Sequence, residues 1–143
     1  MQVPQISVFL ENKVGRMAEV TEVLAANEIN IIALSVADTS EFGILRLIVN
    51  KPEVAYEKLK GEGFTVMTNF VVAVEVDDTP GGLARILRTL TDASLNVEYM
   101  YAFVERSTGR AALIFRFDKE GEAIKVLQAA GVNILQKVDI FQN

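Results

Sequence analysis

The stretch GRMAEVTEVLAANEIN at residues 15–30 recurs as GGLARILRTLTDASLN at residues 81–96, an offset of 66. Both copies begin with glycine, end with asparagine and carry apolar residues at three- and four-residue steps, the period of a helix buried on one face. The same offset aligns Gly43 with Gly109. A period that runs through several elements indicates two copies of one folding unit.

The offset is not constant along the two copies. Leu47 falls on Leu113 at an offset of 66, whereas Gly63 falls on Gly131 at an offset of 68. We therefore place a two-residue insertion near residues 117–120.

Within each copy the hydrophobic pattern alternates between strand and helix periods. Ile6, Val8 and Leu10 alternate with other residues, which is typical of a strand buried on one face. The same reasoning predicts strands over 5–10, 29–37, 44–49, 64–68, 72–76, 95–104, 111–117 and 132–141, and helices over 17–24, 53–61, 83–90 and 120–130.

The order β-α-β-β-α-β is the ferredoxin-like arrangement, an antiparallel sheet with both helices on one face. We predict an α+β protein with two tandem ferredoxin-like repeats, residues 1–69 and 70–143, side by side in a continuous antiparallel sheet. The junction at 68–70 contains neither Gly nor Pro and is too short for a free linker. We therefore expect the two halves to touch.

Composition excludes several classes of function. The chain of 143 residues has 14 basic and 19 acidic residues, a formal charge of -5, which disfavours nucleic acid and membrane surfaces as partners. It has no Cys and no His, which removes disulfides, thiolate nucleophiles and imidazole chemistry. The first ten residues lack the pattern of a signal peptide, so we expect a cytoplasmic protein without a metal or other cofactor.

Both first strands lead into a helix start that contains glycine, ENKVGRM at 11–17 and DDTPGGL at 77–83. Backbone amides at a helix start lack helical partners and lie at the positive end of the helix dipole, which suits a carboxylate. The alternative is ordinary capping, with Thr79 or Asp78 as N-cap and Pro80 as the first helical residue.

Asn30 and Asn96 take the same place in both repeats, at the start of the second predicted strand. Asparagine is depleted in strands, so its recurrence favours a role in binding. The alternative is a turn residue that tolerates a left-handed backbone.

The run at 78–83 followed by 93–97 resembles the signature of ACT domains, and so does Gly15 followed by 27–31. The resemblance covers nearly the whole chain, twice, and the first half is similar in particular to the serine-sensing ACT domain of phosphoglycerate dehydrogenase. It implies a small-molecule sensor that is not itself an enzyme. ACT domains commonly pair side by side through their second strands and first helices and bind amino acids at the interface.

Carried over by position, the resemblance implies that Asn12 and Asn30 hold an amino acid in the first repeat, with Asp78 and Asn96 in the same places of the second. Nearby amides would bind the carboxylate, and Asn12 or Asp78 the ammonium. The candidate ligand-binding residues are Leu10, Glu11, Asn12, Val14, Gly15, Arg16, Met17, Asn30, Asp78, Pro80, Gly81, Gly82, Leu83 and Asn96.

The two pockets are not expected to be equal, because Asp78 is anionic where Asn12 is neutral. We predict one functional pocket, formed by the Asn12 loop and the Asn96 strand, and a weaker or empty one at Asp78 and Asn30.

Departures from the family pattern limit what the resemblance implies. The family's site histidine falls on Leu10 and its proline on Val14, so the ligand's side-chain preference does not carry over. Met17 and Leu83 also fit the apolar helix stripe, which favours a role in the core for both.

Tyr99, Tyr101 and Phe103 alternate along one predicted strand and share a face, while Met100, Ala102 and Val104 share the other. We place the aromatic residues on the sheet face without helices and predict that this open face pairs with a second chain as a homodimer. The alternative is the opposite assignment of the faces, with the aromatic residues in the core.

The predicted function is an amino-acid-binding regulatory protein, which would act on a separate enzyme in trans. The alternatives are a ferredoxin-like module for single-stranded RNA or for protein interaction alone, and an acylphosphatase-like enzyme using Arg16. The acidic charge and Arg116 on the third strand of the second repeat disfavour RNA.

Overall fold

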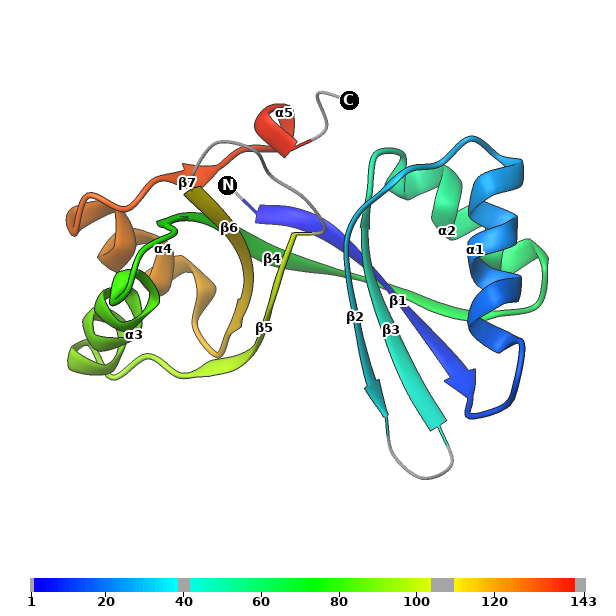
Figure 1. Cartoon of the computed structure of the whole chain (residues 1–143), viewed down its shortest axis with the longest axis horizontal. Helices are drawn as coiled ribbons and strands as arrows, with labels where there is room; N and C mark the ends of the chain where they lie inside the picture. Colours follow the sequence, from blue (N-terminus) through cyan, green and yellow to red (C-terminus); the bar gives the residue numbers. More distant parts are fainter. Residues whose placement is uncertain (1, 39–41, 104–109, 141–143) are drawn as a thin grey trace. The chain divides into compact units, whose positions relative to one another are not determined.

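The computed structural model describes residues 2–38, 42–103 and 110–140. The chain divides into two compact units (Figure 1). The first is Pro4–Asn69, and the second combines the chain from Phe70 onward with Gln2 and Val3. Val104 and residue 141, which end two of the predicted strands, and Gly109 lie outside the described residues. Within the described part, no helix is long and apolar enough to cross a membrane.

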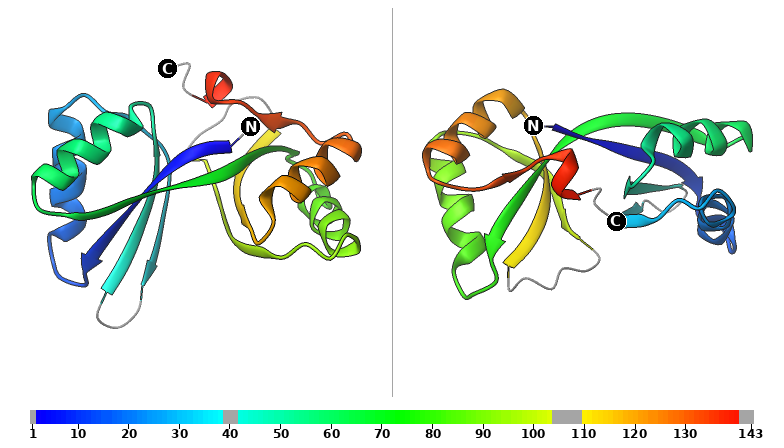
Figure 2. Two further views of the ribbon diagram at one scale, coloured as in Figure 1. Left: turned by 180° about the vertical axis from the view of Figure 1, so that it is seen from behind. Right: turned by 90° about the horizontal axis from the view of Figure 1, so that it is seen from above.

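The first unit has the predicted βαββαβ order. Its elements are β1 (Gln2–Glu11), α1 (Arg16–Ala26), β2 (Ile31–Asp38), β3 (Phe42–Val49), α2 (Pro52–Gly61) and β4 (Thr65–Asp77). Its strands are ordered β2-β3-β1-β4. One alternating set on β1 and β3, which includes Val8 and its register partner Leu45, packs with Val20 and Leu24 of α1 and with Leu59 of α2. Figure 2 shows both helices on one face of these strands.

The second unit repeats this order with β4 as its first strand. Its further elements are α3 (Gly82–Asp92), β5 (Val97–Ala102), β6 (Arg110–Phe117), α4 (Glu120–Ala129), β7 (Ile134–Leu135) and α5 (Lys137–Ile140). Strand β4 pairs with β6 and β7, and β6 pairs with β5. The core combines Val72 and Val74 of β4 with Ile86, Leu90 and Phe115. The tandem α+β fold predicted from the repeat is therefore confirmed.

Strand β4 serves both units. Two strands were expected, over 64–68 and 72–76, but the structure has one strand of 13 residues, Thr65–Asp77. The junction at 68–70 contains no residue that breaks a strand, which permits the extended backbone to continue through it. The described residues consequently form seven strands, because the last strand of the first repeat and the first strand of the second are the same segment.

The last predicted strand, over 132–141, is wrong for most of its length. Strand β7 contains only Ile134 and Leu135, and the chain then turns into α5. The amide of Gln136 donates to Asp139 Oδ2 at 2.9 Å, and the carbonyl of Gln136 accepts a bond from the amide of Asp139 at 3.0 Å. This local capping competes with the strand pattern that the apolar residues predict.

The position of the two-residue insertion is also corrected by the strand registers. Leu34 pairs with Leu47, and Met100, which is 66 residues after Leu34, pairs with Phe115, which is 68 residues after Leu47. The offset has therefore already changed at the start of β6. The insertion lies between β5 and β6 instead of near 117–120, and Leu47 corresponds to Phe115, not to Leu113.

The second strand of each repeat has one unpaired edge. In the described part of the chain, β2 pairs only with β3 and β5 pairs only with β6. The exposed residues on β2 include Leu34 and Val36, at 42% and 49% exposure. Among the described residues, the edge of each second strand that the resemblance assigns to pairing therefore carries no partner strand.

Candidate functional site

The loop between β1 and α1 presents two amides without a backbone partner. Gly15 is the N-cap of α1 at φ 89°, and its carbonyl accepts a bond from the amide of Glu19. The amide of Arg16 bonds to Lys13 O at 3.4 Å. Met17 and Ala18 lie between Arg16 and Glu19, and their amides donate to no backbone group in the described residues. They can receive a carboxylate.

The loop between β4 and α3 has the same backbone geometry. Gly81 is the N-cap at φ 88°, and its carbonyl accepts a bond from the amide of Arg85. The amide of Gly82 bonds to Thr79 O at 3.0 Å. Within the described ranges, the amides of Leu83 and Ala84 have no backbone acceptor.

The capping interpretation of this second loop is wrong in its details. Neither Thr79 nor Asp78 caps α3, which has no side-chain cap, and Pro80 lies before the helix. Gly81 adopts a left-handed backbone, and a Cβ on Gly82 would lie 2.2 Å from Asp77 O. The two glycines are therefore required by backbone conformation and by a close backbone approach.

Charged side chains surround the first loop. Glu11 pairs with Lys13 at 2.8 Å and with Arg16 at 3.5 Å, and Arg16 also pairs with Glu19 at 3.0 Å. The hydrogen bond from Lys13, supported by the charges of Lys13 and Arg16, lowers the pKa of Glu11 below its ordinary value of 4.5. Arg16 is thus held by two carboxylates, and Asn12 is exposed.

The second loop has a different charge pattern. Arg110 lies 3.1 Å from Glu75 and 3.2 Å from Asp77, and Arg85 lies 3.9 Å from Asp77. Asp78 is exposed and has no ion pair in the described residues.

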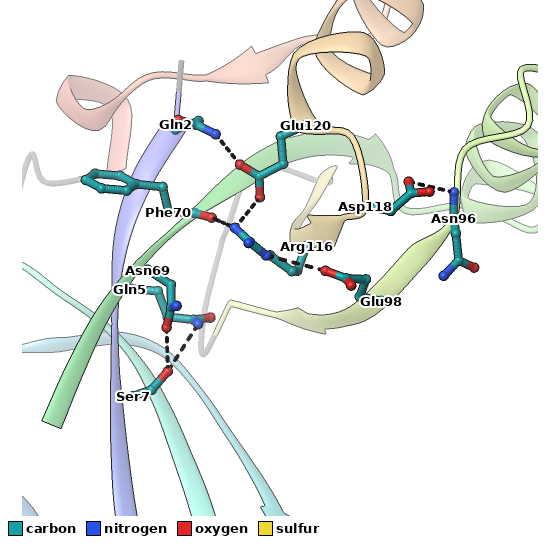
Figure 3. A network of polar contacts seen from close by, with 10 residues as sticks. All are labelled: Gln2, Gln5, Ser7, Asn69, Phe70, Asn96, Glu98, Arg116, Asp118 and Glu120. Atoms are coloured by element: carbon teal, nitrogen blue, oxygen red, sulfur yellow. Dashed lines mark hydrogen bonds and ion pairs between the residues drawn. The ribbon is translucent and has the colours of Figure 1, made fainter. Parts of the chain in front are cut away.

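Asn30 and Asn96 follow the C-terminal ends of α1 and α3, whereas the glycine loops precede the N-terminal ends of these helices. The amide of Asn30 donates to Asn50 Oδ1 at 2.9 Å, and the amide of Asn96 donates to Asp118 Oδ1 at 3.1 Å (Figure 3). Both asparagine side chains are exposed. The left-handed backbone expected at these turns falls instead on Glu28, at φ 54°, and on the corresponding Ser94, at φ 58°.

The structure brings only some of the candidate residues together. The loop residues Leu10, Glu11 and Arg16 lie beside one pocket, described below. Asn12 and Asn30 lie at opposite ends of α1, whose 11 residues span about 16 Å. The site of Asn12 and Asn96 would join residues of different units, and it stays a prediction.

Exposure separates the apolar candidates. Leu10 is buried in the first core, whereas Val14 is fully exposed. Met17 and Leu83 are 50% and 36% exposed, so the interpretation that both are core residues is wrong. Each carries one of the unpartnered amides, and each can contact a molecule bound there.

The sequence did not predict the pocket of about 350 Å³ in the first unit. Three of its residues are phenylalanines, and three are glutamates. It is lined by Phe9, Leu10, Glu11, Arg16, Glu19, Phe42, Glu62, Gly63, Phe64 and Thr65. The signal in the sequence is Phe9, which is apolar at a position where the alternation of β1 predicts a polar residue.

Arg116 on β6 is the centre of a polar network in the second unit (Figure 3). It lies 2.9 Å from Glu120 and 3.5 Å from Glu98, and it donates to the carbonyl of Phe70 at 2.7 Å. Gln2 donates a further bond to Glu120. Burial raises the pKa of Glu120 above its ordinary value of 4.5, although the charge of Arg116 acts in the opposite direction.

The faces of β5 are assigned as predicted. Met100 packs on the helix-covered core, so Tyr99 and Tyr101 lie on the other face, where their rings stack with centroids 6.5 Å apart. Tyr99, Tyr101 and Phe103 are half-buried in the single chain. Ile114, the register partner of Tyr101, is fully buried.

Comparison with protein families finds one model, described as an ACT domain pair, that matches residues 1–142. A search of curated proteins finds no match. Among solved structures, protein BT0572 from Bacteroides thetaiotaomicron is 39% identical over 100% of this chain and 98% of its own, with a TM-score of 0.93.

Two further structures share the fold at low identity. The ligand-free regulatory subunit of aspartate kinase from Thermus thermophilus is 19% identical over 89% of this chain and 91% of its own, with a TM-score of 0.63. The corresponding subunit from Thermus flavus is 18% identical over 90% of each chain, also with a TM-score of 0.63.

Proposed function

Because this chain belongs to the family of ACT domain pairs, we propose that it is a regulatory protein that binds a free amino acid where two ACT repeats meet. The observation that carries the proposal is the pair of unpartnered amides behind a left-handed glycine in each repeat, Met17 with Ala18 and Leu83 with Ala84. Two such amides provide the donors that an amino-acid carboxylate needs. The two similar aspartate kinase structures are of regulatory subunits, in agreement with a regulatory role.

We further propose that a second copy completes the junction between repeats. The free edges of β2 and β5 can each pair with another strand, and exposed Leu34 and Val36 give the β2 edge an apolar side. The open sheet face is a poorer dimer surface, since Ile114 and Ala112 at its centre are already buried in one chain. In this arrangement, ligand binding at the junction alters repeat packing, and a partner enzyme that prefers one packing responds.

A thermal-shift screen against the twenty amino acids tests the binding step. A ligand at about 100 times its Kd stabilises the folded protein by roughly 2.7 kcal/mol, which is readily measured. If none of the twenty shifts the melting temperature, the ligand is not an amino acid and this proposal fails.

Four exposed positions then test which pocket is used. We expect Asn12→Ala and Asn96→Ala to weaken the amino acid's Kd about ten-fold, whereas Asp78→Ala and Asn30→Ala act as matched controls and leave it nearly unchanged. Equal losses at all four positions would show two equivalent sites instead of one. Calorimetry gives both the Kd and the number of sites per chain.

Analytical sedimentation of Val36→Lys tests whether the free edge of β2 pairs with a second copy. A lysine on the unpaired edge of β2 should convert a dimer to a monomer, whereas Val54→Lys, at an exposed position on α2, should not. A dimer that survives the β2 substitution would exclude this edge.

A further inference from the structure

The pocket in the first unit contains three phenylalanines that have no part in the amino-acid site proposed above. Its phenylalanines come from three separate segments: Phe9 from β1, Phe42 from β3 and Phe64 from the turn before β4. Phe9 and Phe42 are 38% and 56% exposed. Aromatic rings attract a cation to their faces, and several around one cavity favour an organic ammonium ion.

The charges around the pocket favour the same kind of ligand. Three glutamates and one arginine line it, a net charge of -2. Glu11 and Glu19 are engaged by Arg16, but the carboxylate of Glu62 has no hydrogen bond or ion pair in the part of the chain that the structure describes. Glu62 is therefore available as a counter-ion for a bound cation.

The second repeat carries different side chains at the positions that correspond to this pocket. At the corrected offsets, Phe9 corresponds to Glu75 and Phe42 to Arg110, and these two form an ion pair at 3.1 Å. Glu62 corresponds to Ala130. The same backbone positions thus hold an aromatic pair in one repeat and a salt bridge in the other, so the ligand chemistry is specific to the first repeat.

We propose that the pocket between β1, β3 and the turn before β4 binds a small primary amine in its ammonium form, with the ammonium beside the rings of Phe9, Phe42 and Phe64 and its charge balanced by Glu62. A volume of about 350 Å³ suits a ligand of this size. All lining residues belong to Pro4–Asn69, so this binding requires no second copy. Three of them, Leu10, Glu11 and Arg16, are also candidate residues of the amino-acid site.

An NMR titration of the whole protein with benzylammonium chloride, at constant chloride and ionic strength, tests the proposal. We expect one site per chain, with amide shifts centred on Glu11, Gly63 and Thr65 and small at the corresponding Asp77, Gly131 and Asn133. Benzyl alcohol, which lacks the charge, should bind at least about five-fold more weakly. Equal binding of the two probes, or equal shifts in the two repeats, would overturn the proposal.

Two substitutions identify the residues responsible. Phe42→Arg copies the second repeat, where arginine is accommodated, and should weaken benzylammonium binding about ten-fold or more. Glu62→Gln should weaken it about two- to five-fold and reduce its dependence on salt. Met67→Ala and Glu53→Gln, exposed positions outside the pocket, are the matched controls.

These outcomes separate this proposal from the previous one. If Phe42→Arg binds the amine as the parent does, the amine pocket is excluded whatever the amino-acid screen gives. If the amine binds but no amino acid does, the pocket stands and the proposed function fails. Repeating the titration with Val36→Lys removes any contribution of a dimer edge.

Discussion

The two glycine loops have the same backbone but different side chains. Each ends in a left-handed N-cap glycine, Gly15 or Gly81, and each leaves two amides without a backbone acceptor among the described residues. The next residue differs, because Arg16 extends toward two carboxylates whereas Gly82 packs against the carbonyl of Asp77. Backbone geometry thus gives both repeats the means to bind an anion, while side chains decide what else can approach.

The largest expected effect on stability is at Gly82, the position at which the two loops carry different residues. Gly82→Ala would place a Cβ 2.2 Å from Asp77 O and should lower the free energy of unfolding by about 2–3 kcal/mol. Arg16→Ala, at the corresponding position, removes exposed ion pairs and should change it by less than about 1 kcal/mol. Urea unfolding measures both. Similar losses in the two variants would mean that the loops are not packed differently.

A second difference between the repeats concerns Arg116 and its partners. Arg116, Glu98 and Glu120 correspond to Ile48, Ile32 and Pro52, so a polar network replaces apolar residues. Arg116→Ile should lower the free energy of unfolding by about 2 kcal/mol, because it leaves the mostly buried Glu120 carboxylate without its cationic partner, with only the neutral Gln2 as a donor.

Adding Glu120→Gln to Arg116→Ile tests that explanation by urea unfolding. The double variant should recover about half of the loss, since the unpaired charge is gone. An additive further loss would show that the network stabilises the fold through packing instead.

A smaller and equal effect is expected at the two N-cap glycines. Gly15→Ala and Gly81→Ala each force a non-glycine residue to a positive φ, and each should lower the free energy of unfolding by about 1 kcal/mol. The shared backbone geometry predicts that the two values agree within about 0.5 kcal/mol in urea unfolding. A clear inequality would break the equivalence of the loops.

The smallest effects are those of pH, and they have opposite signs in the two units. The pKa of Glu120 is raised in the folded protein, so its contribution is fully present below 4.5 and is lost as pH rises through the folded pKa. The pKa of Glu11 is lowered, so its contribution is present above 4.5 and is lost as pH falls through the folded pKa.

The free energy of unfolding of the parent, of Glu120→Gln and of Glu11→Gln is measured as a function of pH. The difference between the parent and each variant gives the contribution of that carboxyl group. The stability of the parent relative to Glu120→Gln should decline above pH 4.5, and relative to Glu11→Gln it should decline below pH 4.5. Profiles of the same sign would contradict the assignment of burial to one carboxylate and ion pairing to the other.

The sequence predicts those features that depend on local periodicity. Helices such as α1 and strands such as β1 follow from the spacing of Val20 and Leu24 and of Ile6 and Val8. The tandem ferredoxin-like fold follows because the same spacing recurs. The continuity of β4 was not predicted, since an absence of breakers at 68–70 permits a continuous strand without requiring one.

Side-chain arrangements were predicted less well. The pocket depends on Phe42 and Phe64, which lie far from Phe9 in sequence and meet only after the strands pair. The candidate loop residues were identified by position. Met17 was assigned to the core because the apolar spacing of a helix does not distinguish the exposed margin of its apolar face from the centre of that face. The capping of Gln136 by Asp139 similarly competes with an apolar pattern.

Gln2 bonds to Glu120 across 118 residues of sequence, and the first residues of the chain belong to the unit that is completed last. During synthesis the segment Pro4–Asn69 can fold as soon as it leaves the ribosome, while the residues before it wait for α4. Closure of so long a loop is slow, so we expect the second unit to set the folding rate.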